Sequence, residues 1–180
     1  MVKHRKQIRL KKYDYSQSGL YFVTICTQKR ECLFGNVVDG KMVLNDVGKI
    51  VENVLNSLPN RYKQIELDVS QIMPNHIHMI IIIRSPVRTN HDSPQRRFIQ
   101  HGDKRELLPQ CIGYLKMNSS KQINQYFGVR AHHDAPQHKI FQRNYYEHII
   151  RNEIELNKIP QYIKTNPLFW KIDINNQARL

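Results

Sequence analysis

One stretch in the middle of the sequence decides the fold, and it reads Met73-Pro74-Asn75-His76-Ile77-His78-Met79-Ile80-Ile81-Ile82-Ile83. Pro74 and Asn75 predict a turn, because both residue types favour the backbone angles of tight turns. The continuous aliphatic run that follows the two histidines is typical of a strand at a central position in a sheet. The stretch therefore predicts a turn and then a central strand over residues 76–84.

Other segments have the composition or spacing of strands. Residues 20–27 are rich in β-branched and aromatic side chains and predict a buried strand. Residues 31–44 carry two glycines between short apolar runs and predict a hairpin, and residues 64–72 alternate as a half-buried strand does. A further strand is expected over residues 145–150.

Three segments show the apolar spacing of helices. The first is capped by Asn45 or Asp46, runs to about Leu58 and is ended by Pro59. The second covers residues 107–127. The third covers residues 153–165, with Asn152 as its N-cap, Glu155 at the capping-box position and an internal Pro160 that can kink it.

The order of these elements is strand, hairpin, helix, strand, strand, helix, strand, helix. It predicts an α+β fold, in which an antiparallel sheet has helices packed on one face. We expect a basic N-terminal arm over residues 1–19 and one domain over residues 20–170. A basic loop insertion is expected at 85–105, and a C-terminal tail at 171–180.

Charge gives the first indication of a partner. The chain has 180 residues, with 28 Lys and Arg against 15 Asp and Glu, a net charge of +13. Such an excess favours a polyanion, because neutralised phosphates release counterions. An acidic membrane is less favoured, since no basic amphipathic helix stands out and the longest apolar run is too short to span a bilayer. Three irregularly spaced cysteines predict no disulfide framework and fit a reducing cytoplasm.

His76 and His78 are candidate metal ligands. Residues i and i+2 of a strand point to the same face, so both imidazoles can converge on one ion while Ile77 points away. A pair of hydrogen-bonded histidines without a metal has the same spacing. A rival cluster, which comprises His132, His133, Asp134 and His138, matches no trusted ligand spacing and is better read as a solvated loop.

Tyr162 and Asn166 are four residues apart on the last predicted helix and hence on one face. A phenolate can attack phosphorus, and an amide oxygen can bind a hard metal ion. From spacing alone, a half-buried tyrosine and a helix C-cap before Pro167 are the favoured explanation of the pair. Tyr145 or Tyr146 could be proposed as nucleophile instead, although the strand prediction makes them sheet residues.

These residues together carry a resemblance. Residues 73–80 resemble the HUH motif (His, bulky hydrophobic residue, His) of single-tyrosine transposases. Further stretches at 19–27, 142–152 and 161–167 are similar to the REP-associated tyrosine transposases. The resemblance covers roughly residues 13–170, and the combination in this order is specific although each piece alone is not.

The resemblance implies a ferredoxin-like fold in which His76 and His78 bind a divalent metal, Mg²⁺ or Mn²⁺. It implies that Asn166 is the third ligand and that Tyr162 is the nucleophile, which forms a 5′-phosphotyrosine on single-stranded DNA near a hairpin-forming palindrome. Relatives include dimers that share active sites as well as monomers, so a homodimer stays open. Two alternatives remain: a catalytically silent nucleic-acid-binding regulator, and a metal hydrolase with a water nucleophile.

Basic residues are the candidate DNA contacts. In the N-terminal arm these are Lys3, Arg5, Lys6, Arg9, Lys11 and Lys12. In the folded part they are Lys116, Lys121 and Arg143. For each of them, a solvated surface charge is the plain alternative.

Overall fold

A computed structural model describes residues 18–84, 106–128 and 138–176 of the chain. Its centre is a four-stranded sheet in the order β4-β5-β1-β6, and every neighbouring pair is antiparallel. The strands are β1 (Gly19–Cys26), β4 (Ile65–Met73), β5 (His76–Ile83) and β6 (Tyr146–Ile150). A separate hairpin pairs β2 (Gly35–Val38) with β3 (Lys41–Leu44). The expected α+β fold with an antiparallel sheet is confirmed.

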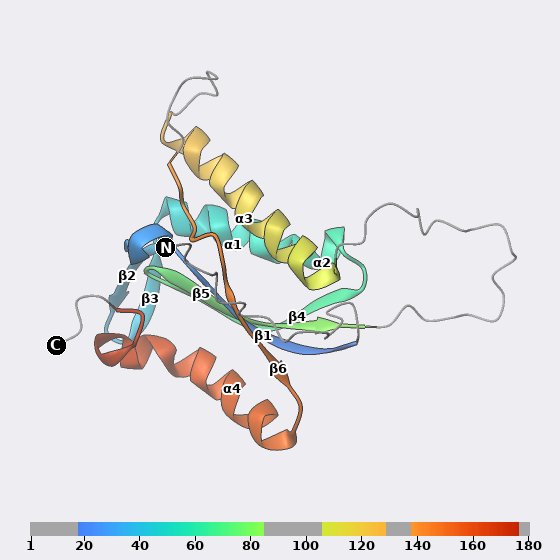
Figure 1. The fold of residues 1–180 in the computed structure, drawn as a ribbon. Helices are drawn as coiled ribbons and strands as arrows, with labels where there is room; N and C mark the ends of the chain where they lie inside the picture. Colours follow the sequence, from blue (N-terminus) through green and yellow to red (C-terminus); the bar gives the residue numbers. More distant parts are fainter. Residues whose placement is uncertain (1–17, 85–105, 129–137, 177–180) are drawn as a thin grey trace, which may run out of the picture.

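The helices lie on both faces of the sheet (Figure 1). On one face are α1 (Asp46–Asn56) and α3 (Leu107–Tyr126), as the sequence predicts. On the opposite face is α4 (Glu153–Thr165), which leads into the 3-10 helix η2 (Asn166–Ile172). The expectation of helices on one face thus holds for α1 and α3, while α4 follows β6 and covers the other side.

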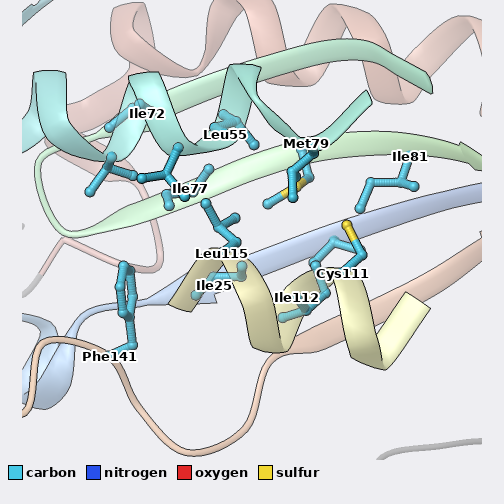
Figure 2. Packing of buried hydrophobic residues seen from close by; sticks show 14 of the residues in the cluster. Ile25, Leu55, Ile72, Ile77, Met79, Ile81, Cys111, Ile112, Leu115 and Phe141 are labelled. Atoms are coloured by element: carbon cyan, nitrogen blue, oxygen red, sulfur yellow. The ribbon is translucent and has the colours of Figure 1, made fainter. Parts of the chain in front are cut away.

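The alternation of side chains along β5 explains these two layers. Ile77, Met79 and Ile81 have no exposed surface and lie in the larger core with α1 and α3, where Leu115 packs near them (Figure 2). The intervening His76, His78 and Ile80 point to the α4 face and are also buried. Because both faces are covered, β5 can be continuously apolar from Met79 to Ile83, as is typical of a central strand.

Helix termini follow the sequence signals with one difference. The side chain of Asn45 caps α1 by accepting a hydrogen bond from the Gly48 N–H over 2.9 Å. Helix α1 ends at Asn56, and Pro59 does not end it, which corrects our prediction. Pro59 instead lies in the first turn of the short helix α2 (Leu58–Arg61), where a missing N–H breaks no helical hydrogen bond.

Helix α4 begins and ends where the sequence predicts. Asn152 caps it by accepting from the Glu155 N–H over 2.8 Å. The Glu155 carboxylate accepts from the Arg151 N–H over 3.1 Å, which is one residue earlier than a standard capping box. The helix continues through Pro160 to Thr165, so the proline does not end it.

Several predicted features lie outside the described residues. They are most of the basic arm, the insertion at 85–105, and His132, His133 and Asp134 of the rival cluster. Of that cluster only His138 is described, and its side chain is exposed. Among the described helices, none is both long enough and apolar enough to cross a membrane.

Candidate active site

The histidine pair lies buried at the start of β5. His76 is 0% exposed and His78 is 2% exposed. Strand alternation turns both side chains to the α4 face, and their Nε2 atoms are 3.0 Å apart. The two rings are steeply inclined, with centroids 4.4 Å apart. Two nitrogen lone pairs can therefore converge on one point.

Each imidazole is oriented through its other ring nitrogen. Nδ1 of His76 lies 2.8 Å from Oδ1 of Asn75. The amide nitrogen of Asn75 already donates to the carbonyls of Arg30 and Asn175, so its oxygen accepts and His76 carries its proton on Nδ1. The Nε2 atom of His76 then carries no proton, so its lone pair is available to bind a metal.

Thr24 orients the ring of His78 through its Nδ1 atom. Its hydroxyl lies 2.8 Å from Nδ1 of His78, and Thr24 is the direct cross-strand partner of His78 in the β1–β5 register. A hydroxyl can donate or accept, so Thr24 suits either tautomer of the ring. When it accepts, Nε2 of His78 is also free to bind an ion.

Burial keeps both rings neutral. Loss of hydration lowers the pKa of His76 to about 3, and the nearby charge of Arg30 acts in the same direction. Burial also lowers the pKa of His78 to about 3; the effect of His76 adds to this, and Asp173 opposes it. The pair is thus held in the state that offers lone pairs rather than positive charge.

Asp173 joins the histidines, and sequence reasoning missed it. Donor atoms of His76, His78 and Asp173 lie within 4.8 Å of one another, and this group could hold a metal ion. Asp173, Asn175 and Asn176 are buried, although residues 171–180 were expected to form a tail. The available signal was Trp170, a large aromatic residue at the proposed domain end, whose ring lies 6.1 Å from that of His76.

Asn166 lies beside Asp173 at the end of α4. It is 2% exposed, and its amide nitrogen donates to Oδ2 of Asp173 over 2.9 Å. Its buried Oδ1 has no hydrogen-bond partner among the described residues. An unpartnered buried carbonyl oxygen is unfavourable on its own, and a cation is a partner that would satisfy it.

Tyr162 reaches the histidine pair from α4. Its hydroxyl lies 3.3 Å from Nε2 of His78, and the two rings are 5.2 Å apart. The side chain is 43% exposed, so a substrate can approach it. Burial of the rest of the ring raises the pKa of Tyr162; the negative charge of Asp173 adds to the rise, and a hydrogen bond with Asn166 opposes it.

The other two tyrosines lie differently. Tyr145 is partly buried against the larger core. Tyr146 points to the α4 face at the sheet edge and contacts Phe22, with ring centroids 6.1 Å apart. Tyr162 contacts His78 directly, through its hydroxyl and through its ring.

The basic residues predicted in the folded part differ in their surroundings. The Lys116 ammonium donates to the backbone carbonyls of Gln142, Arg143 and Asn144 and thereby holds the segment before β6. Burial lowers the pKa of Lys116 to about 8. Lys121 and Arg143 are exposed.

Comparison with known proteins identifies the fold and the family. The structure matches that of a REP-associated tyrosine transposase bound to a REP hairpin, with a TM-score of 0.54 and 15% sequence identity over 93% of this chain and 73% of that chain. The chain therefore has the fold of this REP-associated tyrosine transposase. No family model matches the sequence.

The sequence itself matches an uncharacterized protein of Haemophilus influenzae. The two are 38% identical over 173 residues, which cover 96% of this chain and 93% of that protein. The chain belongs to the same family as the Haemophilus protein.

Proposed function

We propose that this protein nicks single-stranded DNA and transfers the cut strand, with Tyr162 as nucleophile and a divalent ion, Mg²⁺ or Mn²⁺, held by His76 and His78. One observation carries the proposal. The Tyr162 hydroxyl lies 3.3 Å from Nε2 of His78, and that nitrogen lies 3.0 Å from Nε2 of His76. The oxygen of the proposed nucleophile therefore lies close to both nitrogens that could bind the metal. The transposase fold supports the same assignment.

The donor set fits such an ion. Two neutral imidazole nitrogens, a carboxylate oxygen of Asp173 and the unpartnered Oδ1 of Asn166 suit Mn²⁺, and the oxygens also suit Mg²⁺. When bound, the ion would draw charge from a non-bridging phosphate oxygen and so make phosphorus easier to attack. We assign Asp173 as a ligand beside Asn166, an addition to the ligands expected from sequence.

The chemical step uses the chain's own tyrosine. The Tyr162 oxygen forms a bond to phosphorus as the bond from phosphorus to the 3′ oxygen breaks. The phenol gives up its proton and the departing 3′ oxygen gains one, so the charge balances and no external energy source is needed. The product is a 5′-phosphotyrosine with a free 3′-OH, and attack by a different 3′-OH rejoins the DNA. Position and electrostatics supply most of the rate.

The substrate is proposed to be single-stranded DNA beside a hairpin-forming palindrome. The structural neighbour is a transposase bound to a REP hairpin, and a net charge of +13 favours phosphates here. The N-terminal arm is proposed as a DNA-binding addition to the domain. Of the basic residues in the folded part, the exposed Lys121 and Arg143 suit phosphates better than Lys116, whose ammonium already binds carbonyls.

A covalent-adduct assay tests the proposal. Labelled single-stranded DNA with candidate flanking hairpins is incubated with the protein and Mg²⁺ or Mn²⁺, and a denaturation-resistant protein–DNA adduct is expected. Tyr162→Phe should abolish the adduct and leave DNA binding intact, while Tyr146→Phe, the matched control on the same face, should retain it. Cleavage that persists in Tyr162→Phe would point to a water nucleophile. Binding without nicking on every substrate would favour a silent regulator.

A further inference from the structure

A cavity of about 510 Å³ opens beside the histidine pair. Its lining includes Phe22, Thr24, His78, Tyr146 and Tyr162, together with Arg30 from the 3-10 helix η1 (Gln28–Arg30). A volume of this size is common for pockets that bind small organic groups. The proposed nucleophile therefore faces a preformed space and not a flat surface.

One side of this cavity is aromatic. Tyr146 lies in the same cross-strand row as His78, because Thr24 pairs with both of them. Its side chain is 52% exposed although it is a large apolar ring. Phe22 meets Tyr146 edge-on at 6.1 Å and Tyr162 edge-on at 6.3 Å, which fixes both rings. An accessible, fixed tyrosine ring is a surface on which a flat aromatic ligand can stack.

Another side of the cavity carries a positive charge. The Arg30 guanidinium donates to the side chain of Asn175 and reaches the Ile174 carbonyl at 3.5 Å. The turn that presents it has left-handed backbone angles at two consecutive residues, Lys29 with φ 53° and Arg30 with φ 56°. Such angles are unfavourable for residues with a side chain and persist only where surrounding contacts hold them. A guanidinium fixed in this way is suited to a phosphate.

We propose that this cavity is a nucleotide subsite, which takes one unpaired base of the DNA next to the phosphate that is cut. The base stacks on Tyr146, and its phosphate lies toward Arg30 and the histidine pair. A ligand that joins a flat aromatic ring to an anion matches both sides of the cavity, and a nucleotide is such a ligand. The subsite rests on the proposed function, since it explains how the phosphate would be delivered to Tyr162.

The test measures binding without cleavage. In EDTA, fluorescence anisotropy compares a short labelled thymidine oligonucleotide with an abasic strand of the same length. For Tyr146→Ala we expect about 5- to 100-fold weaker binding of the thymidine strand and no change with the abasic strand. Tyr146→Phe should retain the wild-type affinity, because stacking needs only the ring. Tyr126→Ala is the matched control, since Tyr126 is also exposed (55%) but lies at the end of α3.

The outcomes separate this subsite from the nicking activity. If Tyr146→Ala binds the thymidine strand as tightly as the wild type, or loses the same affinity for both strands, the subsite is overturned. If the adduct forms in the wild type while Tyr146→Ala has no effect on binding, only the subsite fails. If no adduct forms but the thymidine-specific loss is found, the nicking proposal fails and the base-binding cavity stands. A melting curve for each variant checks folding.

Discussion

Ile163 of α4 and Ile80 of β5 lie in one small apolar cluster on the histidine face of the sheet. Ile163 directly follows Tyr162, and Ile80 is two residues beyond His78 on the same face. The packing of this cluster, which also includes Ile150, therefore helps to set where α4 sits over the sheet. It brings the tyrosine hydroxyl to the histidine nitrogens from 84 residues away in the sequence.

The first prediction follows from the packing of this cluster. Ile163→Ala should lower the free energy of unfolding by about 2–5 kcal/mol, as removal of a fully buried isoleucine generally does. It should also slow nicking in protein that is still fully folded, because α4 loses its fixed position over β5. Denaturant unfolding and single-turnover cleavage measure the two effects.

The matched control for that prediction is Ile123→Ala. Ile123 is equally buried at 0% exposure but lies in the larger core on the other side of the sheet. It should destabilise the protein and leave the nicking rate of the folded fraction unchanged. Equal nicking rates for Ile163→Ala and wild type would contradict the positioning role of the cluster.

Local patterns in the sequence were enough to predict the strands of the sheet and the helix boundaries other than the end of α1. The turn at Pro74 and Asn75, the caps Asn45 and Asn152, and the aliphatic run after His78 each depend on neighbouring residues, and the structure bears them out. Strand alternation likewise predicted that both histidines share a face.

Contacts between segments that are distant in the sequence could not be predicted from such local patterns. Asp173 lies far from His76 in the sequence, so no short motif contains both residues. It joins the site only because α4 and η2 fold back over the sheet. The side of the sheet on which α4 packs depends on the same long-range arrangement. Lys116 has the sequence context of a surface lysine, and only the path of residues 142–144 gives its ammonium three carbonyl partners.

A second prediction concerns the orientation of His78. Thr24→Val keeps the shape of the side chain and removes the hydroxyl that contacts Nδ1 of His78. We expect Mn²⁺ affinity, measured by titration calorimetry, to fall about 10- to 100-fold, as it does when a partner of a ligating histidine is removed. Thr24→Ser restores the hydroxyl and should restore most of the affinity. Unchanged Mn²⁺ binding in Thr24→Val would show that His78 needs no such partner.

A third prediction separates Lys116 from the DNA-binding residues. Lys116→Met leaves the carbonyls of residues 142–144 without their ammonium donor, so the free energy of unfolding should fall by about 1–3 kcal/mol. The salt dependence of DNA binding should stay as in the wild type. Lys121→Met is the control: it should leave stability unchanged and reduce the salt slope if Lys121 binds phosphate. A reduced slope in Lys116→Met would contradict this division.

The last prediction is a pH dependence of stability that comes from the buried histidines. The pKa of each is about 3 in the folded protein against an ordinary value of 6.5. Between these values the unfolded chain binds protons that the folded chain does not, so stability is full above pH 6.5 and is lost as the pH falls. The free energy of unfolding in EDTA should drop by about 1.4 kcal/mol per pH unit for each histidine.

The double variant His76→Gln, His78→Gln should lose this part of the slope between pH 6 and 5, because glutamine does not titrate there. A double variant with the wild-type slope would show that the pair is not held neutral by burial.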